Sequence, residues 1–349
     1  MKMRTFHRFH CGVNLWTVSL KTIHEEILIM RALICGVSGQ DGSYLAEFLL
    51  NRGYSVFGTS RDAKVNDFKN LHKLGIHNRV KTISMAINDF RSVITTIKEI
   101  QPLEIYNLAG QSSVALSFEQ PVETLESITI GTLNLLESIR FLDENIRFYN
   151  AASSECFGDT GGVSADEKTP FQPRSPYAVA KAAAFWEVAN YREAYGLKAC
   201  SGILFNHESP LRPERFVTKK IIQAACNIST RKQDKLMLGN LSISRDWGWA
   251  PEYVEAMWKM IQLDKLKDFV IATGTSYSLE SFVCEVFAQL NLDWREYVSM
   301  NTKLLRPSEI AYSCGNPAKA GNELGWVAKS KMKEVVAMMI KSCSVDDNK

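Results

Sequence analysis

The chain has 349 residues, a net charge of +3 and 23% charged residues, and its size suits one main domain plus a second lobe. This charge gives no basic field that would favour nucleic acid, and no apolar run approaches the ~20 residues of a membrane span. The eight cysteines are scattered, without metal-type spacing, which favours a reducing, cytoplasmic setting and predicts no metal site.

The first 29 residues form a separate question. They begin with a basic and aromatic stretch, and no clean apolar core with a small-residue cleavage site follows. A secretory signal is therefore not indicated. Met30 directly precedes the first predicted strand, so residues 1–29 are either a disordered extension or translated upstream sequence. We assign them no function.

The first predicted unit is a strand, a glycine turn and a helix. An apolar run at residues 27–35 leads into Gly36, Gly39 and Gly42, and residues 43–50 read as an amphipathic helix. This is the context of a dinucleotide fingerprint, in which the glycines permit a tight turn, approach of the diphosphate and close helix packing. The diphosphate would sit on the helix N-terminus. The alternative is a glycine turn of an α/β protein without cofactor.

The second predicted strand, residues 54–59, ends at Ser60, Arg61 and Asp62. An acidic residue here would bind the ribose 2′-hydroxyl of NAD, whereas an arginine accommodates the 2′-phosphate of NADP. Arg61 comes first, so the sequence favours NADP. The alternative for Arg61 is a solvated loop charge.

The rest of the chain continues to alternate strands and helices. Strands are predicted at residues 79–87, 104–109, 147–152, 198–205 and 268–272, and helices at residues 90–100, 121–142 and around Tyr177. This alternation predicts an α/β fold with a doubly wound parallel, Rossmann-type sheet and a smaller C-terminal lobe. We expect the cofactor domain at residues 30–205. Residues 206–349 then form mainly the substrate lobe, with about 268–275 returning to the sheet.

The strongest chemical pattern is Ser153-x-Glu155 followed by Tyr177-x-x-x-Lys181. Tyr177 and Lys181 share a helix face, where an ammonium group would favour the ionised phenol and lower its pKa. Such a phenol can take a hydroxyl proton while the carbon loses hydride. Glu155 adds a base for a C–H proton beside the new carbonyl, so the set suggests oxidation followed by elimination. By itself, the Tyr–Lys spacing also arises by chance on surface helices.

Several longer segments carry a resemblance. They are Gly36-Val-Ser-Gly-Gln-Asp-Gly42, Tyr106-Asn-Leu-Ala-Gly-Gln-Ser112, Pro173-Arg-Ser-Pro-Tyr-Ala-Val-Ala-Lys181, Asn206-His-Glu-Ser-Pro210, Phe216-Val-Thr218, Arg245-Asp-Trp-Gly248 and Arg306-Pro-Ser-Glu309. With them the chain resembles the GDP-mannose 4,6-dehydratases of the extended short-chain dehydrogenase/reductase superfamily over nearly all of residues 31–340. The segments at 206–210 and 245–248 discriminate best.

The resemblance implies a lyase that uses NADP, recycled within each turnover, and GDP-mannose or a related GDP-sugar. Tyr177 would take the C4 hydroxyl proton, and Lys181 would hold the nicotinamide ribose and lower the pKa of Tyr177. Ser153, where threonine is usual, would bond the C4 oxygen. Glu155 would remove the C5 proton and assist loss of the C6 hydroxyl.

The resemblance also implies two binding sets. Cofactor contacts fall on Gly36, Ser38, Gly39, Gln40, Asp41, Gly42, Arg61, Leu108, Ala109, Gln111, Tyr177, Lys181 and His207. Substrate contacts fall on Ser112, Asn206, Arg212, Val217, Lys220, Arg245, Arg306 and Glu309. Without the resemblance, each arginine reads as a surface or salt-bridge residue, and His207 reads equally as an orienting residue.

Departures from the family pattern leave the sugar and the assembly open. Where the family usually has an Asp that meets the adenine amino group, this chain has Ala86, and Asn88 or Asp89 could take over that contact. The family's arginine loop after the second strand is reduced to Arg61, which leaves homodimer and homotetramer both open. Gly110 and Ser113 beside the sugar pocket could suit another GDP-sugar such as a GDP-heptose. Two different functions also stay open: a reductase or epimerase of the same superfamily, and a non-catalytic NADP-sensing partner protein.

Overall fold

The computed structural model describes residues 30–346, so both interpretations of residues 1–29 concern a segment outside the described part. A seven-stranded parallel sheet in the order β10-β6-β5-β4-β1-β2-β3 forms its centre. The strands are β1 (Arg31–Cys35), β2 (Ser55–Ser60), β3 (Lys81–Ser84), β4 (Glu104–Asn107), β5 (Arg147–Ser153), β6 (Ala199–Leu204) and β10 (Phe269–Ile271). This confirms the predicted doubly wound α/β fold.

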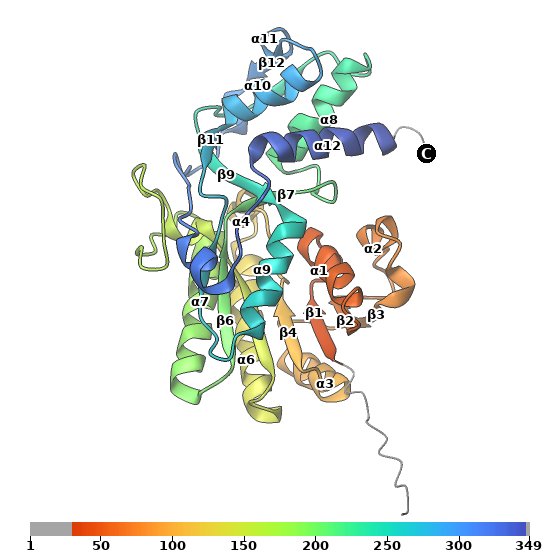
Figure 1. Ribbon diagram of the computed structural model, residues 1–349, viewed down its shortest axis with the longest axis vertical. Helices are drawn as coiled ribbons and strands as arrows, with labels where there is room; N and C mark the ends of the chain where they lie inside the picture. Colours follow the sequence, from red (N-terminus) through yellow and green to blue (C-terminus); the bar gives the residue numbers. More distant parts are fainter. Residues whose placement is uncertain (1–29, 347–349) are drawn as a thin grey trace, which may run out of the picture.

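Helices cover both faces of this sheet, which explains the nearly continuous burial of its inner strands. On one face, α1 (Gln40–Leu50) covers β1 and β2, and α9 (Ala250–Gln262) packs beside it over β5 and β6. On the other face lie α3 (Phe90–Ile100), α6 (Gly131–Leu142) and α7 (Pro176–Tyr195). Figure 1 shows these two layers around the sheet.

The helix predicted at residues 121–142 is interrupted. It consists of α5 (Pro121–Leu125), a π-helical turn (Glu126–Ile130) and α6. The wider turn brings Thr129 against α7, where its hydroxyl donates to the carbonyl oxygen of Ala180 at 3.2 Å. Such π-turns are often found at functional sites, and this one lies against α7, the helix that carries Tyr177.

A second lobe sits over the carboxyl ends of the sheet strands (Figure 1). It contains a three-stranded sheet, β11-β9-β7, and a two-stranded sheet, β12-β8. Its strands are β7 (Asn206–Glu208), β8 (Leu236–Leu238), β9 (Ser244–Trp249), β11 (Ser276–Ser278) and β12 (Val298–Met300), and its main helices are α8 (Val217–Ser229), α10 (Leu279–Gln289) and α12 (Met332–Asp346). These helices bury a separate apolar core around Phe282 and Val335.

Three further segments refine the expectations. The third strand is shorter than residues 79–87, because residues 77–79 form a 3₁₀ turn before β3. The late segment around 268–272 contributes β10, which pairs with β6. Asp89 caps α3, since its carboxylate accepts from the backbone N–H of Arg91 at 3.1 Å.

Short elements also occur at α2 (Lys69–Lys73), α4 (Val114–Glu119) and α11 (Trp294–Tyr297). Within residues 30–346, the helices lack the length and apolar character needed to cross a bilayer.

Candidate active site

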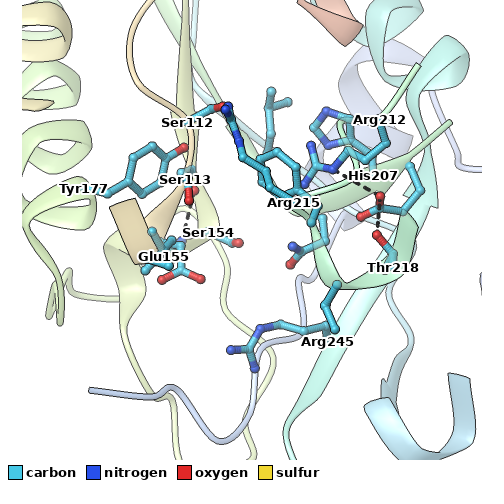
Figure 2. A pocket seen from close by; sticks show the side chains of 18 of the residues that line it. Ser112, Ser113, Ser154, Glu155, Tyr177, His207, Arg212, Arg215, Thr218 and Arg245 are labelled. Carbon is cyan, nitrogen blue, oxygen red and sulfur yellow. Dashed lines mark hydrogen bonds and ion pairs between the residues drawn. The ribbon is translucent and has the colours of Figure 1, made fainter. Parts of the chain in front are cut away.

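A cavity of about 450 Å³ lies between the carboxyl ends of the sheet strands and the second lobe. Its sheet side contains Ser153, Glu155, Tyr177 and Lys181. Its lobe side contains four arginines: Arg212 and Arg215 after β7, Arg245 within β9, and Arg306 after β12. Figure 2 shows side chains from the two sides pointing into the same space. The fold therefore gathers residues more than 100 positions apart in sequence at one site.

The helix that carries Tyr177 begins at a well-defined cap. The hydroxyl of Ser175 accepts from the backbone N–H of Ala178 at 3.1 Å, and Pro176 occupies the first helical position, where its missing N–H costs nothing. Tyr177 and Lys181 then follow one turn apart on the buried face. The Lys181 ammonium donates to the carbonyl oxygen of Ala151 at 2.7 Å, within β5. Helix and strand thus fix both side chains.

The pKa of Tyr177 differs from the sequence expectation. Burial raises the pKa of Tyr177 above its ordinary value, while the Ser153 hydroxyl and the charge of Arg212 oppose that rise. The Lys181 ammonium lies 6.0 Å from the centre of the Tyr177 ring and is held by Ala151. Burial also lowers the pKa of Lys181 to about 8. The protein alone therefore holds Tyr177 as a neutral phenol, because desolvation outweighs the opposing effects of Ser153 and Arg212.

Glu155 is presented by a 3₁₀ turn, Ser154–Phe157, directly after β5. The Ser153 hydroxyl accepts from the backbone N–H of Glu155 at 3.3 Å and so orients the turn. Burial raises the pKa of Glu155; Arg245 and Arg306 oppose this rise, and Glu309 adds to it. A carboxylate with a raised pKa is a stronger base than an exposed one.

Cys156, which follows Glu155, behaves as a packing residue. Burial raises the pKa of its thiol to about 12, and its Sγ lies 3.9 Å from the carbonyl oxygen of Ala178. A buried, neutral thiol packed under the helix start is typical of a structural cysteine.

The glycine turn after β1 has room for a dinucleotide. Gly36 has φ +83°, and a Cβ there would come within 2.9 Å of the Leu108 carbonyl oxygen. A Cβ on Gly42 would meet Val37 Cα at 2.8 Å, whereas Gly39 meets only one atom, at 3.4 Å. Gly39 precedes α1 with no side-chain cap, so the first N–H groups of α1 are available to an anion. These residues fit the diphosphate of a dinucleotide.

Asp41 and His207 join this turn to the second lobe. His207 Nε2 lies 2.9 Å from Asp41 Oδ2, and His207 Nδ1 lies 2.7 Å from the carbonyl oxygen of Phe205. Burial opposes the charged forms, yet the pairing lowers the pKa of Asp41 to about 2 and raises the pKa of His207. Gln40 adds a second link, accepting from the Ser209 hydroxyl at 2.8 Å. His207 is therefore an orienting residue as well as part of the cavity wall.

Arg245 and Arg306 form a positive cluster near Glu155. Arg245 donates to the carbonyl oxygen of Ile310 at 2.8 Å, and its Nη2 has no hydrogen-bond partner among residues 30–346 although it is buried. Glu309 Oε1 lies 3.8 Å from Arg245 and 3.6 Å from Arg306. Two guanidinium groups thus share one carboxylate, and a free buried donor remains. Such groups suit a phosphate.

Arg212 is held differently. Its Nε lies 3.2 Å from Glu208 Oε2, its guanidinium stacks 3.8 Å from the Phe216 ring centre, and Glu208 accepts from the Thr218 hydroxyl at 2.7 Å. Arg212 is therefore neutralised by a buried carboxylate. Lys220 donates to the carbonyl oxygen of Met237 at 2.8 Å.

Most predicted site residues lie together. The cavity lining includes Asp41, Leu108, Ala109, Gln111, Ser112, Ser153, Glu155, Tyr177, Lys181, Asn206, His207, Arg212, Val217, Lys220, Arg245 and Arg306. Glu309 adjoins it through the two arginines. Gly36, Ser38, Gly39, Gln40 and Gly42 lie in the turn beside it.

Arg61 lies outside this cavity lining, after β2. Its side chain is 74% exposed, and its guanidinium donates to Glu123 of α5 at 2.5 Å. Local sequence patterns do not reveal this ion pair, because its partners are 62 positions apart.

The lining also contains residues without a predicted site role, notably Glu208, Thr218 and Arg215. Glu208 and Thr218 lie in the family-like segments around 206–210 and 216–218, and this position in the sequence could have identified them as site residues. Arg215 lies between those segments, and no sequence pattern identified it. Among residues 30–346, no group of three or more His, Cys, Asp or Glu residues is arranged to hold a metal ion.

Comparisons with known proteins agree with this geometry. The model of the family described as GDP-mannose 4,6 dehydratase matches residues 33–339. GDP-mannose 4,6 dehydratase 2 of Caenorhabditis elegans is 46% identical, covering 89% of this chain and 88% of the relative.

Solved structures share the fold at lower identity. A dTDP-glucose 4,6-dehydratase from Bacillus anthracis in complex with NAD has a TM-score of 0.79 at 19% identity, covering 91% of this chain and 98% of the other. A Pseudomonas aeruginosa protein named RMD, complexed with NADPH, has a TM-score of 0.75 at 19% identity, covering 91% and 99%. At such identities the likeness concerns the fold alone, and the family follows from the sequence match over most of the chain. The chain belongs to the GDP-mannose 4,6-dehydratase family.

Proposed function

We propose that this chain converts GDP-α-D-mannose to GDP-4-dehydro-6-deoxy-D-mannose and water. The observation that carries the proposal is Glu155 in the same cavity as Ser153, Tyr177 and Lys181. Oxidation of an alcohol needs only the tyrosine and the lysine. A second base beside them permits removal of a C–H proton next to the new ketone, and membership of the family supplies the GDP-mannose.

The proposed cofactor is a nicotinamide dinucleotide, and specifically NADP. The turn of Gly36, Gly39 and Gly42 would receive the diphosphate at the start of α1, with Leu108 beside it. Arg61 is the first residue after β2, and its exposed guanidinium could exchange Glu123 for a 2′-phosphate. Nucleotide released from the purified protein identifies the cofactor, and recovery of NAD alone would contradict the choice of NADP.

In the first proposed step, the chain removes hydrogen from C4. A bound oxidised nicotinamide would supply the hydride acceptor, and its positive charge would favour the ionised phenol beside it. Tyr177 would take the C4 hydroxyl proton, Ser153 would bond the same oxygen, and Lys181 would hold the ribose of the cofactor. The rise that burial causes in the pKa of Tyr177 makes the phenolate, once formed, a strong base.

In the second proposed step, Glu155 removes the C5 proton. The 4-ketone acidifies this proton, and the C5–H electron pair forms the C5–C6 double bond as the C6 hydroxyl leaves. Glu155 then gives the proton to that hydroxyl, which departs as water. Hydride would return to C6, and the proton added at C5 would be balanced by the one that Tyr177 took from the C4 hydroxyl. The cofactor would then end as it began, and no external reductant is consumed.

Substrate binding is proposed for the lobe side of the cavity. Arg245 and Arg306 would bind phosphate or ribose oxygens, Glu309 would accept from ribose hydroxyls, and Arg212 would lie near the diphosphate. Further proposed contacts are Ser112, Asn206, Val217 and Lys220. The free Nη2 of buried Arg245 is the main support, because a buried donor without a partner is costly.

One assay separates this function from a reductase, an epimerase or an NADP-sensing protein. The protein is incubated with GDP-mannose without added NADPH, and the sugar is analysed by NMR. A 4-keto sugar with C6 deoxygenated is expected. A hexose that keeps its C6 oxygen would reject the lyase: an inverted ring centre would indicate an epimerase, and an unchanged hexose would leave the reductase and the NADP-sensing protein. Parallel incubation with a GDP-manno-heptose tests the related substrate, and a clear preference for the heptose would correct the sugar.

The charges around Glu155 give a pH prediction. Glu155 must be ionised to act, so kcat should fall on the acid side around its raised pKa. Arg306→Gln removes a charge that lowers this pKa, and Glu309→Gln removes one that raises it. The acid limb should therefore move to higher pH in the first variant and to lower pH in the second. A pH profile of kcat at saturating substrate checks this, and movement in the same direction would contradict the assigned base.

We further propose that the chain forms a homodimer through α7 and the helical segment at residues 121–142. Two such dimers could build a homotetramer. These packed helices expose large apolar side chains, including Phe141 (68%), Trp186 (62%) and Val122 (66%). Large exposed apolar side chains along packed helices are typical of protein–protein interfaces. Light scattering of wild type and Trp186→Glu tests this, and a monomeric wild type would contradict it.

We propose that the two sides of the cavity bind different ligands. Residues 30–205 would bind the cofactor, and residues 206–349 would mainly bind the GDP-sugar, with 268–275 completing the sheet. The scattered cysteines, among which no disulfide forms in residues 30–346, support a cytoplasmic enzyme, and cell fractionation tests that location.

A further inference from the structure

Arg215 belongs to a short turn between β7 and α8. The turn is fixed at both ends, since Arg212 N–H donates to the Ser209 carbonyl oxygen at 3.0 Å and Phe216 N–H donates to the Pro213 carbonyl oxygen at 3.1 Å. The Arg215 side chain is exposed, yet it lines the cavity that holds Glu155 and Tyr177. In Figure 2 it extends into that cavity from the lobe side, toward the wall carrying Ser112.

The charges of the cavity set Arg215 apart from the other arginines. Arg212 has Glu208 as its carboxylate partner, and Arg245 and Arg306 share Glu309. In the described part of the chain, Arg215 has no carboxylate within ion-pair distance, and its guanidinium lies 5.4 Å from the centre of the Phe216 ring. Its five N–H donors are therefore available to a ligand.

The charge of the neighbouring cluster leaves room for a further cation. Glu309 lies within ion-pair distance of both Arg245 and Arg306, and Glu155 adds a second carboxylate beside them. A diphosphate bridging two esters carries about two negative charges at neutral pH. Arg215 supplies a further positive charge at the same cavity, on a guanidinium whose planar fork matches phosphate oxygens.

Two diphosphates are available, one in the cofactor and one in the nucleotide sugar. The cofactor diphosphate would bind at the start of α1, near Gly39. Arg215 instead comes from the lobe turn that leads into α8, two residues before Val217. We propose that Arg215 binds the diphosphate of the GDP-sugar and thereby sets the affinity for substrate. This inference rests on the proposed function, because it takes the nucleotide sugar as the ligand.

The test compares two ligands on three variants. GDP and NADP are titrated separately into wild type, Arg215→Gln, Arg215→Lys and the control Arg91→Gln, whose exposed side chain lies on α3. Loss of one charge-assisted hydrogen bond should weaken GDP binding of Arg215→Gln about tenfold. NADP affinity should stay within about twofold, Arg215→Lys should be intermediate, and Arg91→Gln should match wild type.

Kinetics with GDP-mannose provide the second readout. Because the diphosphate is bound equally in the ground state and the transition state, KM should rise about tenfold while kcat stays within about twofold. Unchanged GDP affinity in Arg215→Gln, or a loss confined to NADP, would overturn the assignment and leave the dehydratase proposal standing. Conversely, a tenfold loss of GDP affinity in a protein that does not dehydrate GDP-mannose would support Arg215 and reject the reaction.

Discussion

Replacing Glu155 by glutamine is expected to lower kcat for GDP-mannose dehydration by about 10²–10⁴-fold, the usual worth of a general base. Glutamine keeps the shape and removes a charge that burial disfavours, so folding should survive. In the proposed mechanism, the first oxidation does not use Glu155. Under single turnover, the absorbance of reduced nicotinamide should therefore rise and persist, whereas in wild type it should rise and decay.

A matched control distinguishes the specific effect of Glu155→Gln from the effect of removing any carboxylate. Glu144 is exposed and lies beyond α6, so Glu144→Gln should retain wild-type kcat. The exchange of the C5 hydrogen with deuterated water gives an independent readout, since it requires proton removal by Glu155. Wild-type dehydration or wild-type exchange in Glu155→Gln would show that another group takes the C5 proton.

Local sequence rules predicted the parts of the site that depend on periodicity and turn chemistry. Four-residue spacing places Tyr177 and Lys181 on one face of any helix, and Gly36 adopts the positive φ that its turn requires. The carboxyl end of β5 delivers Ser153 and Glu155, as expected for a parallel sheet. Each of these features is encoded within a few residues, so no knowledge of distant contacts was needed.

Features set by distant contacts could not be predicted in this way. The π-helical turn at Glu126–Ile130 depends on packing against α7, 51 positions away at Ala180. The segment Asn206–Glu208 is recognisable as a motif but not as a strand, because its partner β9 lies in the second lobe. The pKa of Tyr177 is raised by burial, and the spacing of Tyr177 and Lys181 in the sequence does not reveal that burial. The Arg61–Glu123 pair is a further example.

The contrast between Tyr177 and Lys181 shows how the fold prepares the first step. Burial disfavours charge on both groups, raising the pKa of Tyr177 and lowering the pKa of Lys181 to about 8. The protein alone therefore makes the phenolate costly, and in the proposed mechanism the proton transfer would depend on the positive charge of the bound cofactor. This coupling would restrict base formation to the complex in which hydride can leave, which limits unproductive proton transfer.

Replacing Tyr177 by phenylalanine should consequently stop the reaction before Glu155 acts. The ring would keep its packing against Ile128, Ala180 and Ala184, so only the hydroxyl is lost. We expect kcat to fall by about 10²–10⁴-fold. Unlike Glu155→Gln, this variant should give no rise in reduced nicotinamide in a single turnover.

The matched control is Tyr195→Phe, on the same helix but 45% exposed and outside the cavity lining. It should retain wild-type kcat and the transient rise in reduced nicotinamide. The kcat of the double variant Tyr177→Phe/Glu155→Gln should lie within about twofold of the kcat of Tyr177→Phe. The effects of two residues that act in successive steps of one reaction are not additive. A rise in reduced nicotinamide in Tyr177→Phe would reject Tyr177 as the base of the first step. It would leave Glu155 as the residue on which the dehydration depends.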